Sequence, residues 1–152
     1  MKIYNLIFKI IFPLIFLRSI YKSLRFGENL SRILEKFSFY KGEKGSERII
    51  HIHAVSVGEV LASRKFIEEI QRRFPDHQIL ITCTTQTGSA IIKRLYGNSV
   101  FHQYMPFDLK TCINRFLKIW KPEITFILET EIWPNFINIL NKQHRKVFLV
   151  NG

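Results

Sequence analysis

Two acidic residues stand directly after short apolar runs that are typical of buried strands. Glu59 comes shortly after the run 48–54, and Glu129 directly follows the run 124–128. Because an ionised carboxylate is expensive to bury without partners, we expect Glu129 to be buried and hydrogen-bonded. Glu59 could be a general base that deprotonates a hydroxyl, or it could only complement the dipole of a helix that begins there. Glu131 is expected to be an exposed loop acid.

Two segments near these acids could bind a polar ligand. The segment 84–89 reads Thr-Thr-Gln-Thr-Gly-Ser before a helix, so its N–H groups and hydroxyls could receive a phosphate or a sugar. Alternatively, Ser89 is simply the N-cap of that helix. Gly58, ahead of Glu59, would permit a tight turn and a close ligand approach. The candidate binding residues are Ser56, Gly58, Thr84, Thr85, Thr87 and Gly88.

Other site classes are disfavoured by the residues present. The sequence has neither a P-loop nor a G-x-G-x-x-G motif, which argues against nucleotide sites of those kinds. Cys83 and Cys112 lie far apart in no paired motif, so we expect two buried reduced thiols. His51 and His53 share one strand face without nearby acids, which is typical of core or hydrogen-bonded histidines. We therefore expect no metal and no cofactor.

The charge predicts an anionic partner. The chain has 152 residues with 23 Lys plus Arg against 12 Asp plus Glu, a formal net charge of +11. A nucleic acid, a phosphorylated molecule or a membrane surface would fit this charge. Nucleic acid is not expected, because no helix-turn-helix, zinc-finger or RNP-type motif is present. The basic residues that precede the first acid, Glu28, are Lys2, Lys9, Arg18, Lys22 and Arg25.

The same basic start is also the most apolar part of the chain. The run 3–17 is interrupted by Asn5, Lys9 and Pro13, and it is shorter than the roughly 20 residues that span a bilayer. No small-residue cleavage pattern follows it, which disfavours a signal peptide. We expect residues 1–25 to be a helix that associates with a membrane surface. The alternative is a core helix that packs on the rest of the domain.

Apolar runs and amphipathic helices alternate after residue 26. This alternation predicts an α/β fold over 26–152, a Rossmann-like parallel sheet with helices on both faces. Ligands bind such sheets at the carboxyl ends of the strands. Asp108 is the expected N-cap of the helix 109–120. Strands are expected at 48–54, 78–83, 99–104, 124–128 and 146–150, and helices at 30–37, 60–74, after 89 to Gly97, 109–120 and 136–144, with a turn-rich connection at 41–46.

Four ordered motifs resemble the amino-terminal half of bacterial 3-deoxy-D-manno-octulosonic acid (Kdo) transferases. They are His-Ala-Val-Ser-Val-Gly-Glu at 53–59, Thr-Thr-Gln-Thr-Gly-Ser at 84–89, Tyr-Met-Pro-Phe-Asp at 104–108 and Glu-Thr-Glu-Ile-Trp-Pro-Asn at 129–135. The resemblance implies a GT-B glycosyltransferase, in which two Rossmann-like domains face each other across a cleft. It also implies that Glu59 matches the catalytic base and that Glu129 matches a position assigned to transition-state support.

The implied reaction is transfer of Kdo from CMP-Kdo to the lipid A precursor (lipid IVA) in lipopolysaccharide biosynthesis. The resemblance places it at the cytoplasmic side of the cell inner membrane, without a bound metal. The family continues past Gly152 into a carboxyl-terminal CMP-Kdo-binding domain, so this chain is expected to be the acceptor-binding half and to be inactive alone. The alternative is a non-catalytic membrane-bound module that binds anionic glycolipid or a partner domain.

Overall fold

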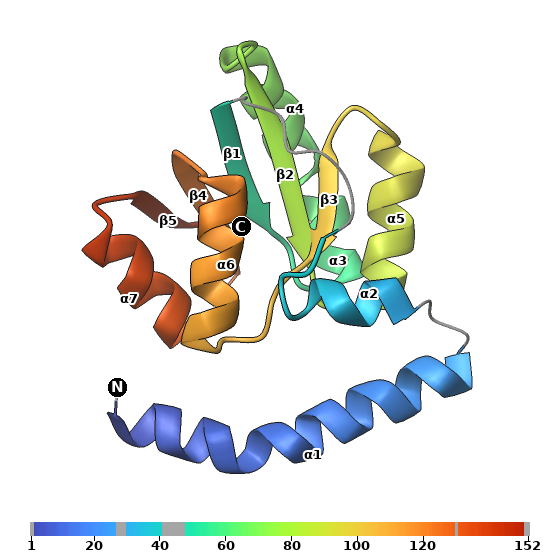
Figure 1. Ribbon diagram of the computed structural model, residues 1–152. Coiled ribbons are helices and arrows are strands. Elements are labelled where there is room, and N and C mark those ends of the chain that lie inside the picture. The colour runs from blue at the N-terminus through green and yellow to red at the C-terminus, as the bar shows by residue number, and fades with distance from the viewer. Residues whose placement is uncertain (1, 27–29, 41–47, 130, 151–152) are drawn as a thin grey trace.

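The computed structural model describes residues 2–26, 30–40, 48–129 and 131–150, so the connection expected at 41–46 lies outside the described residues (Figure 1). Five strands form one all-parallel sheet in the order β3-β2-β1-β4-β5. The predicted α/β fold is confirmed. The strands are β1 (Arg48–His53), β2 (His77–Cys83), β3 (Phe101–Tyr104), β4 (Ile124–Leu128) and β5 (Lys146–Val150).

Helices cover both faces of the sheet (Figure 1). One face buries Val60, Ile67 and Ile92 from three helices, and the other buries Ile113 and Phe136 from two more. Because both faces are covered, the central strands β1 and β2 are buried continuously after their first residues rather than at alternate positions. The helices are α1 (Lys2–Phe26), α2 (Leu30–Glu35), α3 (Val57–Ala62), α4 (Arg64–Arg73), α5 (Gln86–Tyr96), α6 (Lys110–Trp120) and α7 (Pro134–Lys142).

The prediction of a single helix at 60–74 is wrong. It is two helices, α3 and α4, separated at Ser63. The Ser63 hydroxyl donates to the carbonyl of Val60 at 3.1 Å, and this bond competes with the regular helix ladder. Ala62, at the end of α3, is exposed, whereas Ile67 and Ile70 of α4 are buried.

Helix α1 has two different apolar faces. On its inner face Tyr4, Phe8, Phe12 and Phe16 form a ladder of rings, which contacts Phe37 and Phe107 of the domain. The outer face carries large apolar side chains that are 44–74% exposed. These are Ile3, Leu6, Ile7, Ile10, Ile11, Leu14, Leu17 and Tyr21, called the outer stripe below.

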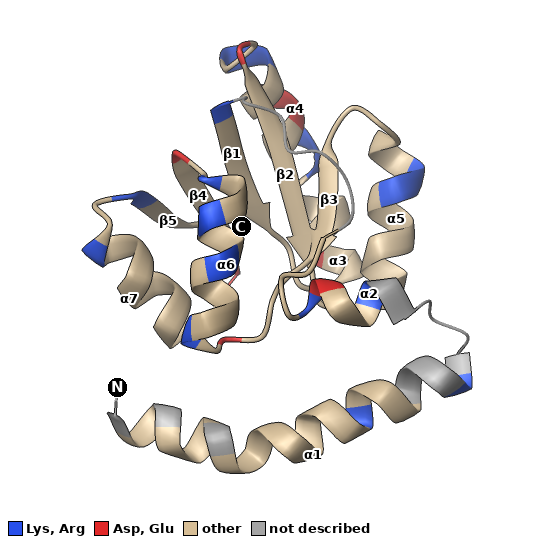
Figure 2. Cartoon of the chain, in the orientation of Figure 1, with Lys and Arg blue, Asp and Glu red and all other residues tan. Residues whose placement is uncertain are grey.

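Helix α1 lies beyond the carboxyl ends of the strands, next to α2 (Figure 1). Within the described part of the chain, no helix combines the length and apolar content that crossing a bilayer requires. Of the basic residues on α1, Arg18 and Arg25 are exposed, and the structure does not describe the side chains of Lys2, Lys9 and Lys22 (Figure 2). The inner face therefore packs as a core helix would, while the outer stripe is left uncovered.

Candidate active site

The sheet has its topological switch point between β1 and β4. The helix that follows β1 packs on one face and the helix that follows β4 packs on the other, so the connections diverge from two adjacent strands. A crevice at the carboxyl ends of such a strand pair is where open α/β sheets bind ligands. Glu59 follows β1 and Glu129 follows β4. The topology therefore brings together the two carboxylates that the sequence singled out.

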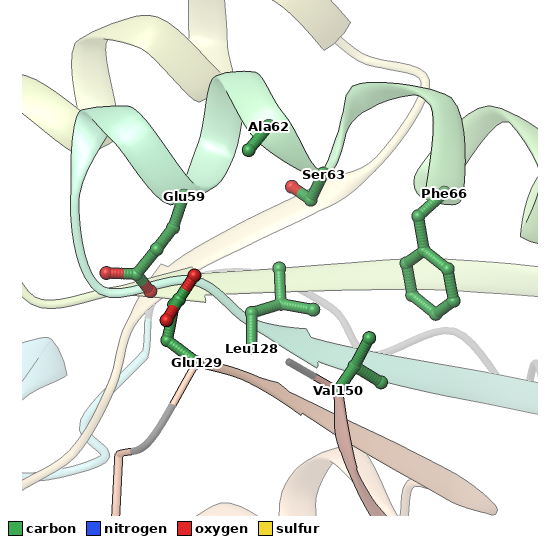
Figure 3. Close-up of a pocket in the computed structure, with 7 residues that line it drawn as sticks. All are labelled: Glu59, Ala62, Ser63, Phe66, Leu128, Glu129 and Val150. Carbon is green, nitrogen blue, oxygen red and sulfur yellow. The ribbon is translucent and has the colours of Figure 1, made fainter. Parts of the chain in front are cut away.

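A pocket of about 110 Å³ lies at this place (Figure 3). The carboxylates of Glu59 and Glu129 point toward one another at one end, while Phe66 and Val150 lie at the other. The floor is mostly apolar, so a ligand there would meet charge at the rim and hydrophobic contact below. The lining residues are Glu59, Ala62, Ser63, Phe66, Leu128, Glu129 and Val150.

Glu59 is held in a defined orientation by the turn that begins α3. One carboxylate oxygen accepts the N–H of Val55 at 2.7 Å, and the other accepts the Ser56 hydroxyl at 3.0 Å. Ser56 is the N-cap of α3, and its hydroxyl oxygen accepts the N–H of Glu59 in return. This reciprocal arrangement is a variant of the capping box. Glu59 thus complements the helix start, as one interpretation of the sequence expected, and its carboxylate also lines the pocket, while its role as a general base stays a prediction.

Glu129 differs from the expectation of a buried acid. It is exposed, and its backbone has a φ of +61°, in the left-handed region that non-glycine residues rarely occupy. Its N–H donates to the carbonyl of Val150 at 2.9 Å, which ties the end of β4 to the end of β5. Its side chain lines the pocket and points toward Glu59 (Figure 3). Glu131 is half-buried, so the prediction that it is an exposed loop acid is also wrong.

Replacing Glu129 by glycine should stabilise the fold. Glycine adopts a positive φ without the cost of about 1 kcal/mol that other residues incur, so we expect the free energy of unfolding to rise by about 1 kcal/mol. Urea denaturation of the parent and of Glu129→Gly measures this change. Ala62→Gly, at a helical position in the same pocket, is the control and should instead destabilise. A lower stability of Glu129→Gly would contradict strain at this position.

The hydroxyl-rich segment adjoins the pocket without lining it. Helix α5 begins at Gln86, earlier than expected, and its N-cap is Thr85 rather than Ser89, because the Thr85 hydroxyl accepts the N–H of Gly88 at 3.1 Å. A Cβ at Gly88 would meet that hydroxyl oxygen at 2.9 Å, so glycine permits the cap. The Thr84 hydroxyl donates to the carbonyl of Val55 at 3.3 Å. This bond joins the segment to the turn that carries Glu59.

The remaining candidate binding residues, Thr87 and Gly58, do not line the pocket either. Thr87 is exposed in the first turn of α5, with its hydroxyl 3.5 Å from that of Thr85. Gly58 lies inside α3 and has no positive φ, so the expected tight turn is wrong. The nearest atom to a Cβ built there is the Ser56 hydroxyl oxygen at 3.8 Å. A Cβ at this position would make only an ordinary van der Waals contact, so the geometry of α3 does not require glycine here.

Asp108 caps a different helix from the one expected. The N-cap of α6 is Leu109, and the Asp108 carboxylate instead accepts the N–H groups of Asn135 and Phe136, each at 2.9 Å, at the start of α7. The Tyr4 hydroxyl also donates to it, at 2.8 Å. Burial raises the pKa of the Asp108 carboxyl, and these three donors partly oppose that rise. The four residues were not connected by sequence reasoning, because α1 and α7 are far from Asp108 along the chain.

The histidine pair belongs to the core, as expected. His51 and His53 are buried, and both rings hydrogen-bond the Thr82 hydroxyl, at 2.8 and 2.9 Å. Burial lowers the pKa of His53 to about 4 and that of His51 well below its usual value. Cys83 and Cys112 are buried free thiols, which confirms that prediction.

Among the described residues, no three His, Cys, Asp or Glu side chains gather in a way that could hold a metal ion.

The sequence did not identify Ala62, Phe66 and Val150 as residues of the site. The apolar periodicity that marks them as core gives no sign of an opening between α3 and the end of β5. Only the pairing of β4 with β5 places Val150 beside Glu129.

Residues 31–152 match the profile of a family described as "3-Deoxy-D-manno-octulosonic-acid transferase (kdotransferase)". The chain belongs to the Kdo transferase family. It is 40% identical over 110 residues to a 3-deoxy-D-manno-octulosonic acid transferase of Haemophilus influenzae, covering 72% of this chain and 26% of the relative. The relative from Rickettsia bellii is 30% identical over 152 residues, 100% of this chain and 36% of its own.

A third Kdo transferase, from Chlamydia muridarum, is 29% identical over 139 residues, which are 89% of this chain and 32% of the relative. The chain thus spans about a quarter to a third of the length of these curated relatives. The profile match includes all four motifs at 53–59, 84–89, 104–108 and 129–135, so the predicted resemblance is confirmed.

Proposed function

We propose that this chain is the acceptor-side part of an enzyme that transfers Kdo from CMP-Kdo to the lipid A precursor in lipopolysaccharide biosynthesis. The observation that carries the proposal is the pair of carboxylates, Glu59 and Glu129, at one rim of the pocket at the switch point. Membership in the Kdo transferase family supports the same chemistry. The donor would be held by a further domain of the GT-B type, across the cleft.

Glu59 would act as the general base. The Val55 N–H and the Ser56 hydroxyl fix its carboxylate, which leaves lone pairs directed at the pocket. It would take the proton of the acceptor's primary hydroxyl while that oxygen bonds to the anomeric carbon of Kdo and the bond from that carbon to the CMP phosphate oxygen breaks. The products are the Kdo-bearing glycolipid and CMP. Glu129, beside Glu59, would stabilise positive charge that develops on the sugar.

A chimera tests the proposal. Residues 1–152 would replace the matching amino-terminal segment of the Haemophilus influenzae relative, and the product would be assayed by mass spectrometry with CMP-Kdo and lipid IVA. We expect a mass increase of one or more Kdo units on lipid IVA. A well-folded chimera that leaves lipid IVA unmodified, while the parent relative modifies it, would contradict the proposal.

We further propose that α1 rests on the cytoplasmic side of the inner membrane, with the outer stripe among the lipid acyl chains. An apolar helical face with basic residues such as Arg18 and Arg25 fits an interfacial helix. This arrangement would bring the carboxyl ends of the strands toward the leaflet that holds a lipid acceptor. It also favours the second candidate function, a non-catalytic membrane-bound module that binds anionic glycolipid or a partner domain.

Charges in the outer stripe should release the chain from vesicles. Each large apolar side chain buried in lipid contributes roughly 1.5–3 kcal/mol, so the double variant Leu14→Glu/Leu17→Glu should bind more weakly by at least about 100-fold. Sedimentation with phosphatidylethanolamine–phosphatidylglycerol vesicles measures this. The matched control is Leu61→Glu/Leu149→Glu, at side chains 48% and 57% exposed outside α1. Equal binding of both double variants would contradict a membrane role for the stripe.

A further inference from the structure

One buried carboxylate joins three segments that are far apart in the sequence. Asp108 is only 2% exposed. Its Oδ1 accepts the N–H of Phe136, and its Oδ2 accepts both the N–H of Asn135 and the hydroxyl of Tyr4. The Asn135 side chain donates back to the carbonyl of Asp108 at 2.6 Å. The loop after β3, the start of α7 and the first turn of α1 therefore meet at a single group.

These contacts hold one end of the loop that carries Glu129. The loop runs from the end of β4 to the start of α7. Its first end is tied by the bond from the Glu129 N–H to the carbonyl of Val150, and its second end is tied by Asp108 to the N–H groups of Asn135 and Phe136. The described residues on either side of position 130 are thus tied at Glu129 and at the start of α7. We therefore expect that loss of the Asp108 contacts would let the start of α7 move and that Glu129 would move with it.

Tyr4 contributes a contact that packing alone does not require. Its ring already stacks on Phe8 within the inner ladder of α1. The hydroxyl adds a bond to an oxygen that already has one backbone partner, and it acts between groups 104 residues apart. Because hydrogen bonds to a buried carboxylate are directional and stronger than neutral ones, this bond fixes where the carboxylate sits. The position of α1 on the domain and the position of the first residues of α7 then depend on one another.

We propose that Asp108 and Tyr4 are positioning residues for Glu129. The contact of α1 with the domain, made through these two residues, fixes the position of the start of α7 and thereby the position of Glu129. The proposal rests on the proposed function for the role of Glu129 but not for the loop geometry. Neither residue lines the pocket. Their effect is indirect, through the backbone of α7 and the loop.

Fluorescence of Trp133 tests the loop geometry without any assay of transfer. Trp133 lies in the loop, with its ring 5.4 Å from that of His53, and Trp120→Phe makes it the sole tryptophan of the chain. In that background Tyr4→Phe removes only the hydroxyl. We expect acrylamide quenching of Trp133 to rise about two-fold and its emission to shift to the red. Tyr96→Phe is the control, because its hydroxyl has no hydrogen-bond partner among the described residues, and it should change neither quantity.

Kinetics in the chimera test the consequence for catalysis. Tyr4→Phe should lower kcat about five-fold and leave both KM for CMP-Kdo and the thermal unfolding midpoint unchanged, whereas a general loss of folding would lower that midpoint as well as exposing Trp133. Asp108→Asn should lower kcat further, and Asp108→Glu should partly restore it. Unchanged quenching and kcat in Tyr4→Phe would overturn its role, even if Asp108→Asn is impaired. If the parent chimera transfers nothing, the proposed function fails, while the Trp133 measurement still decides the positioning.

Discussion

Glu59→Gln is expected to lower kcat in the chimera by about 10²–10⁴-fold, the range that a general base contributes. The amide keeps an oxygen that can accept from the Val55 N–H or the Ser56 hydroxyl, so the turn at the start of α3 should persist. It cannot take a proton from the acceptor hydroxyl. Initial rates with CMP-Kdo and lipid IVA, together with thermal unfolding, separate the loss of the base from loss of the fold.

Glu68→Gln is the matched control for this change. Glu68 lies on α4 and pairs with Arg64 at 2.9 Å, where both side chains are more than half exposed. Removing such a surface pair costs little, so activity and stability should remain close to those of the parent. If Glu59→Gln were as active as Glu68→Gln, Glu59 would be a helix-capping residue only and the base would have to be another group.

Acid should destabilise the fold through buried neutral imidazoles. Burial lowers the pKa of both His53 and His102 from about 6.5 to about 4. Below pH 6.5 these two imidazoles therefore bind protons in the unfolded chain but remain neutral in the native state. The stability that is present above pH 6.5 is lost as the pH falls toward 4. For a shift of this size the loss is about 2 kcal/mol per imidazole between pH 7.5 and 5, or about 4 kcal/mol for the two. Urea midpoints at these pH values measure it.

His102→Gln should make that loss smaller by about 2 kcal/mol. The His102 ring binds the carbonyl of Ile81 through Nδ1 and the Ser89 hydroxyl through Nε2, so a neutral ring serves both bonds and a cation would also face Arg32. His144→Gln, at an exposed position, is the control for the loss of an imidazole from the chain. An identical acid sensitivity in all three proteins would contradict a neutral buried His102.

The order of strands and helices follows from local patterns. β1 and β2 are apolar runs with polar ends, and α6 stops at Trp120, before Lys121 and Pro122, as the sequence predicts. The break at Ser63 could not be predicted, because the local bond from its hydroxyl to the Val60 carbonyl lies beside backbone bonds, from Ser63 to Glu59 and from Ile67 to Ser63, that continue as in a single helix. A side chain that competes with its own backbone leaves no trace in periodicity.

The sequence predicted where the site lies in the sheet, but it did not predict the hydrogen bonds and the exposure of the residues there. Strand ends in a parallel sheet meet at one edge, which is enough to place Glu59 near Glu129. Capping rules are local, so they assign Asp108 to the helix that follows it, whereas its partners start 27 residues later. Glu129 is exposed and has a positive φ, and no residue pattern specifies a positive φ at a glutamate.

The left-handed backbone at Glu129 makes this position a place where two kinds of selection disagree. A library of all substitutions there, sorted for resistance to proteolysis, should enrich glycine above the parental residue. The same library sorted for Kdo transfer in the chimera should deplete glycine and retain glutamate. The rank order of variants would then invert between the two screens, and the size of that inversion would measure how much folding free energy this chain gives up for a carboxylate at the end of β4.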